Sequence, residues 1–253
     1  MSGSVLEVVQ LTYGYKKPLG EGLNFCLPSS SFLAVIGPNG VGKSAFLRTL
    51  LGVIAPLRGE VRYSFPLSCR AQNLAYLPQH PVLPLGLRVE EVVELGRFPR
   101  RRWGLGAGGA VGDRGVVWEA MERAGILELR GRMASRISGG ERQRMHIAQL
   151  LAQDPCIFLL DEPLTHLDLG QRCRVLDLLG SLREEGKVVV ATFHDLEVVS
   201  SVADWVLLLK PGGGYIFGEV EEVLSLEHLR EAFGDISFWE GLGGRFSSFF
   251  VRR

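Results

Sequence analysis

The stretch that decides the fold is Gly37-Pro38-Asn39-Gly40-Val41-Gly42-Lys43-Ser44, which has the G-x-x-x-x-G-K-S spacing of a phosphate-binding loop, or P-loop. The apolar residues 32–36 before it predict a buried strand, and residues 45–51 after it have helical spacing. Glycines allow the backbone to curl so that successive N–H groups point inward, and the N-terminus of the following helix adds a partial positive charge. The stretch therefore predicts a strand–loop–helix unit that binds phosphate groups.

Two side chains of this loop carry specific chemistry. We expect the ammonium group of Lys43 to reach the β- and γ-phosphates of a nucleotide, and the hydroxyl of Ser44 to be a ligand of Mg²⁺. The alternative is a glycine-rich turn that contains a lysine by chance. The strand before the loop and the helix after it favour the nucleotide site, with ATP and Mg²⁺ as cofactors.

Length, composition and charge limit the functional classes. The chain has 253 residues, and 46% of them are hydrophobic, which is enough for a sizeable buried core. Its formal net charge is +0, with 28 basic and 28 acidic residues, so bulk electrostatics gives no reason to expect nucleic-acid binding. No apolar stretch reaches the roughly 20 residues that span a bilayer, and no basic cluster typical of a secretory signal opens the chain. We expect the protein on the cytoplasmic side of a membrane.

Strand and helix signals predict an α/β pattern. Two short strands are expected within residues 7–27, and further strands over residues 59–63 and 74–77. Helical spacing begins at Val89 and is interrupted by the glycine-rich residues 104–115, which predict a loop. It returns over residues 116–124 and 141–153. The later segments alternate between strand and helix: strands over 157–160 and 188–192, and helices over 171–185 and 196–202. Such alternation implies parallel strands with crossover helices.

This pattern predicts one domain over residues 1–234. Its core would consist of residues 1–86 and 152–234, and a mainly helical insertion would cover about residues 87–151. Residues 235–253 form a tail rich in aromatic side chains. A final strand or helix packed on the core is one interpretation of the tail, and a subunit or membrane contact is the other.

Two acids directly follow the apolar strand expected at residues 157–160. Asp161 could sit beside the P-loop and hold Mg²⁺, directly or through water. Glu162 projects one residue further, where its carboxylate could accept a hydrogen bond from an attacking water. Acids often follow strands, so the pair alone is weakly specific, but together with a P-loop it predicts a hydrolytic site.

Residues 137–143, Ile-Ser-Gly-Gly-Glu-Arg-Gln, form a third motif. Ser138, Gly139 and Gly140 at the start of a helix offer backbone N–H groups and a capping hydroxyl. A plain helix cap would be the interpretation if this stretch stood alone. With the P-loop and the two acids, it resembles the signature sequence of ATP-binding-cassette (ABC) ATPases.

The resemblance extends over nearly the whole chain and implies the family's P-loop NTPase fold, an α/β core with an antiparallel β subdomain and a helical insertion. It also implies roles for single residues. Tyr15 would stack on adenine, although neighbouring Tyr13 competes for this role. Gln79 would contact Mg²⁺ from the glutamine loop. Asp168 would belong to the D-loop, and His194 would be the switch histidine.

Two positions depart from the usual family pattern. Glu141 stands where the most familiar form of the signature has glutamine, and Leu164 stands where a small hydroxyl residue is more usual. Glutamate also occurs at the first position in the family, so we expect no loss of activity there. The sequence offers no physical account of the leucine.

The resemblance implies a head-to-tail homodimer that encloses two ATP molecules between the P-loop of one subunit and the signature of the other. Glu162 would orient and polarise the attacking water, and His194 would contact the γ-phosphate. The residues expected to contact ATP are Tyr15, Gly37, Pro38, Asn39, Gly40, Gly42, Lys43, Ser44, Gln79, Ser138, Gly139, Gly140 and Asp168. Those expected to contact Mg²⁺ are Ser44, Gln79 and Asp161.

Motif context favours a transport motor over a non-transport ABC ATPase. A single cassette without a fused membrane domain resembles the ATPases of bacterial importers, and residues 92–99 and 218–224 are similar to those of iron-siderophore, haem and cobalamin uptake. We therefore expect polytopic membrane permease partners, an indirect link to a substrate-binding protein, no nucleic acid, and a peripheral place on the cytoplasmic face of the inner membrane. A zinc or manganese importer and an ATPase of iron–sulfur cluster assembly remain alternatives.

Two smaller features complete the sequence. Arg97, Arg100, Arg101 and Arg102 form a basic run, for which we expect a solvated face, with a lipid or partner contact as the alternative. The four cysteines lack C-x-x-C spacing, so we expect free thiols.

Overall fold

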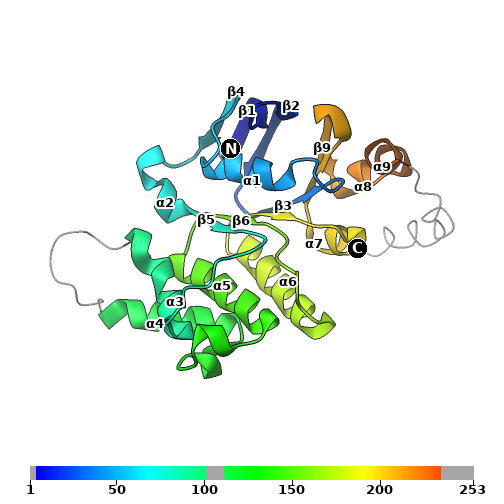
Figure 1. Ribbon diagram of the computed structural model, residues 1–253. Helices are drawn as coiled ribbons and strands as arrows, with labels where there is room; N and C mark the ends of the chain where they lie inside the picture. The colour runs from blue at the N-terminus through cyan, green and yellow to red at the C-terminus, as the bar shows by residue number, and fades with distance from the viewer. Residues whose placement is uncertain (1–3, 101–110, 235–253) are drawn as a thin grey trace. The chain divides into compact units, whose positions relative to one another are not determined.

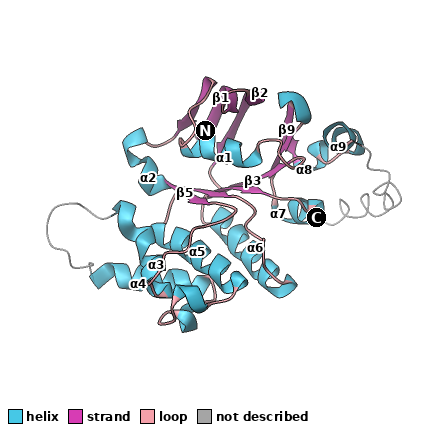
Figure 2. Cartoon of the chain, viewed as in Figure 1, coloured by secondary structure: helices cyan, strands magenta, loops and turns pink. Residues whose placement is uncertain are grey.

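The computed structural model describes residues 4–100 and 111–234, which divide into two compact units (Figure 1). The first unit contains residues 4–64 and 190–234, and the second contains residues 65–100 and 111–189. Figure 2 shows that helices make up most of the second unit.

An antiparallel sheet forms one part of the first unit. Its strands lie in the order β2-β1-β4, with β1 at Ser4–Gly14, β2 at Pro18–Pro28 and β4 at Arg58–Tyr63. Val8 of β1 pairs with Phe25 on one side and Val61 on the other. The two strands expected within residues 7–27 and the antiparallel β subdomain are thereby confirmed.

A second group of strands in the first unit leads into the P-loop. Its members are β3 (Ser31–Ile36), β8 (Trp205–Leu209) and β9 (Tyr215–Glu219), and the strand β7 (Val188–Thr192) ends in this unit. β3 is fully buried and pairs in parallel with β8, with Val35 opposite Leu207. β8 pairs in antiparallel fashion with β9. The sequence analysis did not predict β8 or β9.

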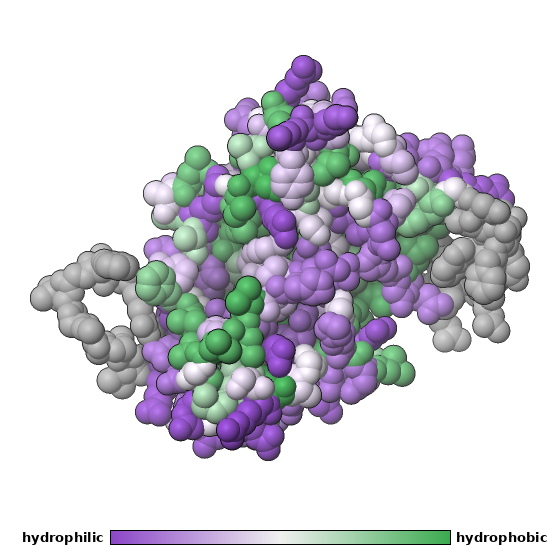
Figure 3. Space-filling model, viewed as in Figure 1, coloured by the Kyte–Doolittle hydropathy of each residue, from purple (hydrophilic) through white to green (hydrophobic). Residues whose placement is uncertain are grey.

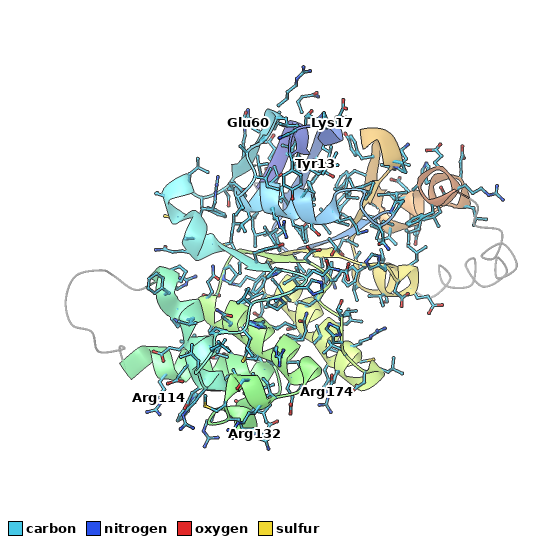
Figure 4. The ribbon with its side chains drawn as sticks, viewed as in Figure 1. Tyr13, Lys17, Glu60, Arg114, Arg132 and Arg174 are labelled. Atoms are coloured by element: carbon cyan, nitrogen blue, oxygen red, sulfur yellow. The ribbon has the colours of Figure 1, made fainter. Side chains whose placement is uncertain are left out.

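The helices of the first unit are α1 (Lys43–Leu51), α7 (Leu196–Val202), α8 (Val220–Val223) and α9 (Leu226–Phe233). α1 buries Phe46, Leu47 and Leu50. The ring of Phe46 lies 5.4 Å from that of Tyr13 in β1, measured between centroids, so the P-loop helix packs on the antiparallel sheet (Figure 4).

The second unit contains two parallel strands, β5 (Leu74–Leu77) and β6 (Ile157–Leu160). Its α-helices are α2 (Arg70–Asn73), α3 (Val89–Glu94), α4 (Val111–Arg123), α5 (Gly139–Gln153) and α6 (Leu169–Glu184). Helices α3, α4 and α5 pack on one another (Figure 1). Short 3₁₀ helices occur at η1 (Leu67–Cys69), η2 (Leu95–Arg100), η3 (Leu127–Leu129) and η4 (Ala134–Arg136), and in the first unit at η5 (Pro211–Gly213).

One predicted loop is wrong in part. α4 begins at Val111, so residues 111–115 are helical, whereas the remainder of the expected loop, residues 104–110, lies outside the described residues. Val117 and Met121 of α4 are buried, and burial of this apolar face outweighs the low helix propensity of Gly115.

In the described part of the basic run, Arg100 is exposed, as expected of a solvated face, whereas Arg97 is half-buried. Nη1 of Arg97 donates to the carbonyl oxygen of Ala152 at 2.8 Å, and Nε of Arg100 donates to that of Gln153 at 2.7 Å. Both arginines therefore satisfy carbonyl groups at the C-terminus of α5, where the helix dipole favours cations. Arg101, Arg102 and the aromatic tail lie outside the described residues.

No helix in residues 4–100 or 111–234 is long and apolar enough to cross a membrane.

Candidate nucleotide site

The P-loop in the first unit encloses its own lysine. Gly42 adopts a left-handed conformation with φ of 111° at the start of α1, which turns the chain from the loop into the helix. Nζ of Lys43 donates to the carbonyl oxygens of Gly37 at 2.7 Å and Pro38 at 3.1 Å, and the side chain is only 8% exposed. The positive charge is thus held inside the curl of the loop, where a phosphate group would be bound.

The first turn of α1 adds further groups for binding an anion. No side chain caps this helix, and its first turn carries no acidic residue, so no carboxylate competes for the helix N-terminus. Ser44 is half-buried in the same turn. Together the turn supplies backbone N–H groups, a hydroxyl and the positive end of the helix dipole.

The two tyrosines that are candidates for stacking on adenine differ in burial. Tyr13 is 0% exposed, and this burial raises the pKa of its hydroxyl. Tyr15 follows β1 and is 60% exposed, so its ring is accessible to a ligand. Tyr13 therefore has a packing role, and Tyr15 is the tyrosine that an adenine can reach.

His194 also belongs to the first unit. It lies two residues beyond β7 and is exposed. The next residue, Asp195, caps α7 by accepting a hydrogen bond from the N–H of Glu197 at 3.0 Å. The cap fixes the backbone immediately after His194 while the imidazole stays accessible.

In the second unit, the two acids and the glutamine loop emerge at one edge of the sheet. Leu77 of β5 is opposite Leu160 of β6 in parallel register, so the residues that follow the two strands leave in the same direction. Asp161 is 2% exposed, and its N–H donates to the carbonyl oxygen of Leu77 at 2.8 Å. Gln79 is half-buried two residues beyond β5.

Glu162 has an unusual backbone conformation. Its φ is 52°, in the left-handed region that non-glycine residues seldom adopt. Its Oε2 accepts a hydrogen bond of 3.3 Å from the hydroxyl of Thr165. The carboxylate is therefore oriented by the loop that follows it, as a group that positions water requires.

The signature turn, residues 138–140, starts α5 with a complete capping box. Oγ of Ser138 accepts from the N–H of Glu141 at 3.3 Å, and Oε2 of Glu141 accepts from the N–H of Ser138 at 2.7 Å. The bond to the Ser138 backbone lowers the pKa of Glu141. The glutamate in place of the familiar glutamine is thus a good capping partner. Ser138 and Gly139 are exposed, so their backbone is open to a ligand.

Asp168 begins the next helix. Its Oδ1 accepts from the N–H of Gln171 at 2.8 Å, which caps α6. Its side chain remains exposed, whereas Leu164 is half-buried in the same loop. The structure explains the aspartate as a cap and gives no reason for the leucine.

The structure thus brings the predicted residues together in two groups. The first unit contains Tyr15, the P-loop and His194, and the second contains Gln79, Asp161, Glu162, the signature turn and Asp168. Sequence reasoning missed Gln143 and Gln171, two side chains that contact the second group. Gln143 follows the signature turn by three residues, and this proximity was the one signal in the sequence.

Exposed apolar side chains follow the glutamine loop. Val82 is 87% exposed and Leu85 is 88% exposed. Beside them, a cavity of about 200 Å³ is lined by the end of β5, by residues that follow this strand, and by His146, Gln149 and Leu150 of α5. Apolar side chains also reach the surface of the second unit in Figure 3.

The donor chemistry of the predicted Mg²⁺ ligands fits that ion. Within residues 4–100 and 111–234, no three His, Cys, Asp or Glu side chains are grouped to hold a metal. Ser44, Gln79 and Asp161 offer a hydroxyl, an amide and a carboxylate oxygen, which are the hard donors that Mg²⁺ prefers in company with water and substrate phosphates. Such a set suits an ion that arrives with the nucleotide.

Comparison with known proteins finds one matching family and several similar proteins. The family model described as ABC transporter matches residues 21–165, more than half of the chain. The iron(3+)-hydroxamate import ATP-binding protein FhuC of Bacillus subtilis is 35% identical, over 90% of this chain and 87% of the relative. The hemin import ATP-binding protein HmuV of Gloeobacter violaceus is 40% identical, over 80% of this chain and 77% of the relative.

Solved structures of ABC proteins are also similar to this chain. An inward-facing metal-chelate type ABC transporter is similar with a TM-score of 0.82 and 31% identity, covering 91% of this chain and 89% of that one. A dimeric ATP-binding cassette, MJ0796 bound to ADP and Pi after hydrolysis, is similar with a TM-score of 0.75 and 26% identity, covering 85% and 98%. The predicted α/β fold is thereby confirmed.

Proposed function

The chain belongs to the ABC transporter family and is an ATPase of that family, and we propose that it powers an importer of an iron–siderophore, haem or cobalamin. The observation that carries the proposal is the geometry of the P-loop. Nζ of Lys43 lies inside this loop, and Gly42 joins the loop to α1. The names of the relatives support the importer over an ATPase of iron–sulfur cluster assembly.

Phosphate binding depends on charge held at fixed positions. The ammonium of Lys43 and the N–H groups of the first turn of α1 would stabilise the negative charge on the β- and γ-phosphates. Ser44, Gln79 and Asp161 would hold Mg²⁺, which, when bound, adds further positive charge against these phosphates. Tyr15 would stack on the adenine.

Hydrolysis depends on Glu162 and His194. The Glu162 carboxylate, oriented by Thr165, would accept a proton from the attacking water and direct its lone pair toward the γ-phosphorus. The exposed His194 would contact the γ-phosphate. Products would be ADP and inorganic phosphate.

A homodimer would complete each site. Ser138 and Gly139 are exposed at the N-terminus of α5, where their backbone could bind the γ-phosphate held by a second copy. The dimeric cassette with 26% identity supports this arrangement. Loss of the γ-phosphate would remove the bridge between the copies and open the dimer. We expect Ser138→Arg to block hydrolysis while ATP still binds, and unimpaired hydrolysis would argue against the arrangement.

Membrane partners would complete the transporter. The cavity beside the glutamine loop and the exposed Val82 and Leu85 offer an apolar surface to a polytopic permease. The chain would then lie peripherally on the cytoplasmic face of the inner membrane, linked only indirectly to a substrate-binding protein. Movement of this surface with the ATP cycle would drive transport.

A pull-down tests the proposal. The tagged chain is purified from its native membranes in mild detergent, and the proteins recovered with it are identified. We expect a polytopic membrane subunit in equal amount, and a bound metal chelate or cobalamin in the associated binding protein. Recovery of soluble partners alone would contradict the transporter and favour an assembly ATPase.

A further inference from the structure

The signature turn, residues 138–140, is tied by side chains to the catalytic loop, which we define as residues 161–168. The first tie is Gln143, which lies on α5 five residues beyond its cap and is 6% exposed. Its Nε2 donates a buried hydrogen bond of 2.9 Å to the carbonyl oxygen of Pro163. That carbonyl belongs to the residue directly after Glu162, so the tie ends beside the general base.

The second tie joins the same two segments from the side of α6. The side chain of Gln171 lies directly against Gly140, so that a Cβ atom at position 140 would overlap with its Oε1. The backbone N–H of Gln171 is held by Asp168 at 2.8 Å. Close packing continues at the neighbouring glycine, because a Cβ at Gly139 would lie 3.7 Å from that of His166.

The catalytic loop needs such support because its backbone is strained. Glu162 and His166 both have left-handed φ values, 52° and 64°. Conformations of this kind persist only where the surrounding contacts impose them. The Gln143 bond reaches the loop between these two residues, and Nε of Arg172 donates to the carbonyl oxygen of Leu167 further along, at 3.1 Å.

We propose that Gln143 is a positioning residue, which couples the place of the signature turn to the orientation of Glu162 through the carbonyl group of Pro163. The inference rests on the proposed function, because only in a dimer do the signature turn and Glu162 act on different ATP molecules. When the signature turn binds one ATP, α5 shifts and moves the Pro163 carbonyl. This movement aligns the Glu162 carboxylate with the other ATP. Gln143 thus couples the two hydrolytic sites.

The test compares two buried glutamines of the same helix. Gln143→Met keeps the length of the side chain and removes the amide that donates to Pro163. Gln153→Met is the matched control, since Gln153 is also buried and donates to backbone carbonyls, at 2.9 Å to Ala71 and 2.7 Å to Leu74, far along α5 from the catalytic loop. Both variants lose buried hydrogen bonds, but only the first loses the tie.

For each full-length variant, kcat, KM, the Hill coefficient for ATP and the melting temperature are measured. We expect Gln143→Met to lower kcat about tenfold, equivalent to about 1.4 kcal/mol of transition-state stabilisation, with KM within about twofold and the Hill coefficient reduced toward one. Gln153→Met should retain kcat. If Gln143→Met does not fold, Gln143→Leu serves instead, because it also removes the donor and introduces no charge.

Two results would overturn the inference. One is a kcat of Gln143→Met close to that of the wild type, and the other is an equal loss of kcat in Gln153→Met, which would show general loosening of α5. Failure of the proposed dimer would look different, because the wild-type chain itself would then stay monomeric with ATP and give a Hill coefficient of one.

Discussion

Nζ of Lys43 lies 2.7 Å from the carbonyl oxygen of Gly37, at the opposite end of the P-loop. The loop is therefore closed on its own lysine, and the ammonium occupies the place where phosphate oxygens would be received. We expect bound ATP to replace these carbonyl contacts with contacts between the Lys43 ammonium and phosphate oxygens.

Removing the lysine charge should weaken ATP binding. Lys43→Met is expected to raise the Kd for ATP about 10- to 100-fold, because hydrogen bonds to charged groups contribute about 1.5–3 kcal/mol. Titration calorimetry gives the Kd. Lys187→Met, which removes an ion pair with Asp154 in the second unit, is the control and should bind as the wild type does. Equal affinity of Lys43→Met and the wild type would remove Lys43 from the phosphate site.

The two tyrosines should respond in opposite ways. Tyr15→Ala is expected to raise the KM for ATP several-fold, because stacking of a base on an aromatic ring contributes about 1–3 kcal/mol. Tyr15→Trp should restore the KM. Tyr13→Phe should leave the KM unchanged and should not reduce the free energy of unfolding, since the buried Tyr13 hydroxyl has no hydrogen-bond partner among the described residues. A raised KM in Tyr13→Phe would contradict the assignment.

Gly96 should tolerate no side chain. A Cβ at this position would collide with the carbonyl oxygen of Gln149 on α5. Gly96→Ala is expected to cost about 1–3 kcal/mol of unfolding free energy, a fall of about 2–10 °C in Tm.

Gly115→Ala in α4 is the matched control for this change, because nothing lies within 4 Å of the added methyl. Alanine favours the helix by about 1 kcal/mol over glycine, so its Tm should rise by about 2 °C. Calorimetry measures the Tm of both variants. An unchanged Tm in Gly96→Ala would contradict the prediction and show that α5 can move aside.

Burial of His146 should make stability depend on pH. Desolvation lowers the pKa of His146 below its ordinary value of 6.5, and the side chain is 5% exposed. The unfolded state then binds more protons at mildly acid pH, so the contribution of His146 to stability is complete above about pH 6.5 and falls as the pH drops below that value.

Chemical unfolding between pH 7.5 and 5 measures this dependence. His146→Leu should flatten it, and His80→Leu, at an exposed position, is the matched control. A slope in His146→Leu equal to that of the wild type would show that other groups cause the dependence.

The bounds of some strands and helices were predicted to the residue and those of others were not, for physical reasons. β5, β6 and β7 are short buried runs bounded by polar residues or turns, so their ends are visible in the sequence. The start of α4 was predicted too late, because the glycines of residues 104–115 indicate a loop. The helix begins at Val111, since packing on α5 stabilises it.

The site was predictable to the extent that its residues form local motifs. The P-loop, the two acids and the signature turn are contiguous stretches with known spacing. Arg97 and Arg100 bind carbonyls more than 50 positions away, and Gln143 binds one 20 positions away. No local pattern encodes contacts of this range, and the choice between Tyr13 and Tyr15 likewise depended on burial in the folded chain.

The most direct test of the account is the association state and turnover of Glu162→Gln with Mg²⁺ and ATP. Light scattering coupled to gel filtration gives the molar mass, and phosphate release gives the rate. The amide cannot act as a base but leaves the P-loop and signature turn intact, so the account predicts an ATP-bound dimer with turnover reduced at least about 100-fold. A chain that stays monomeric in ATP, or that hydrolyses ATP at nearly the wild-type rate, would contradict it.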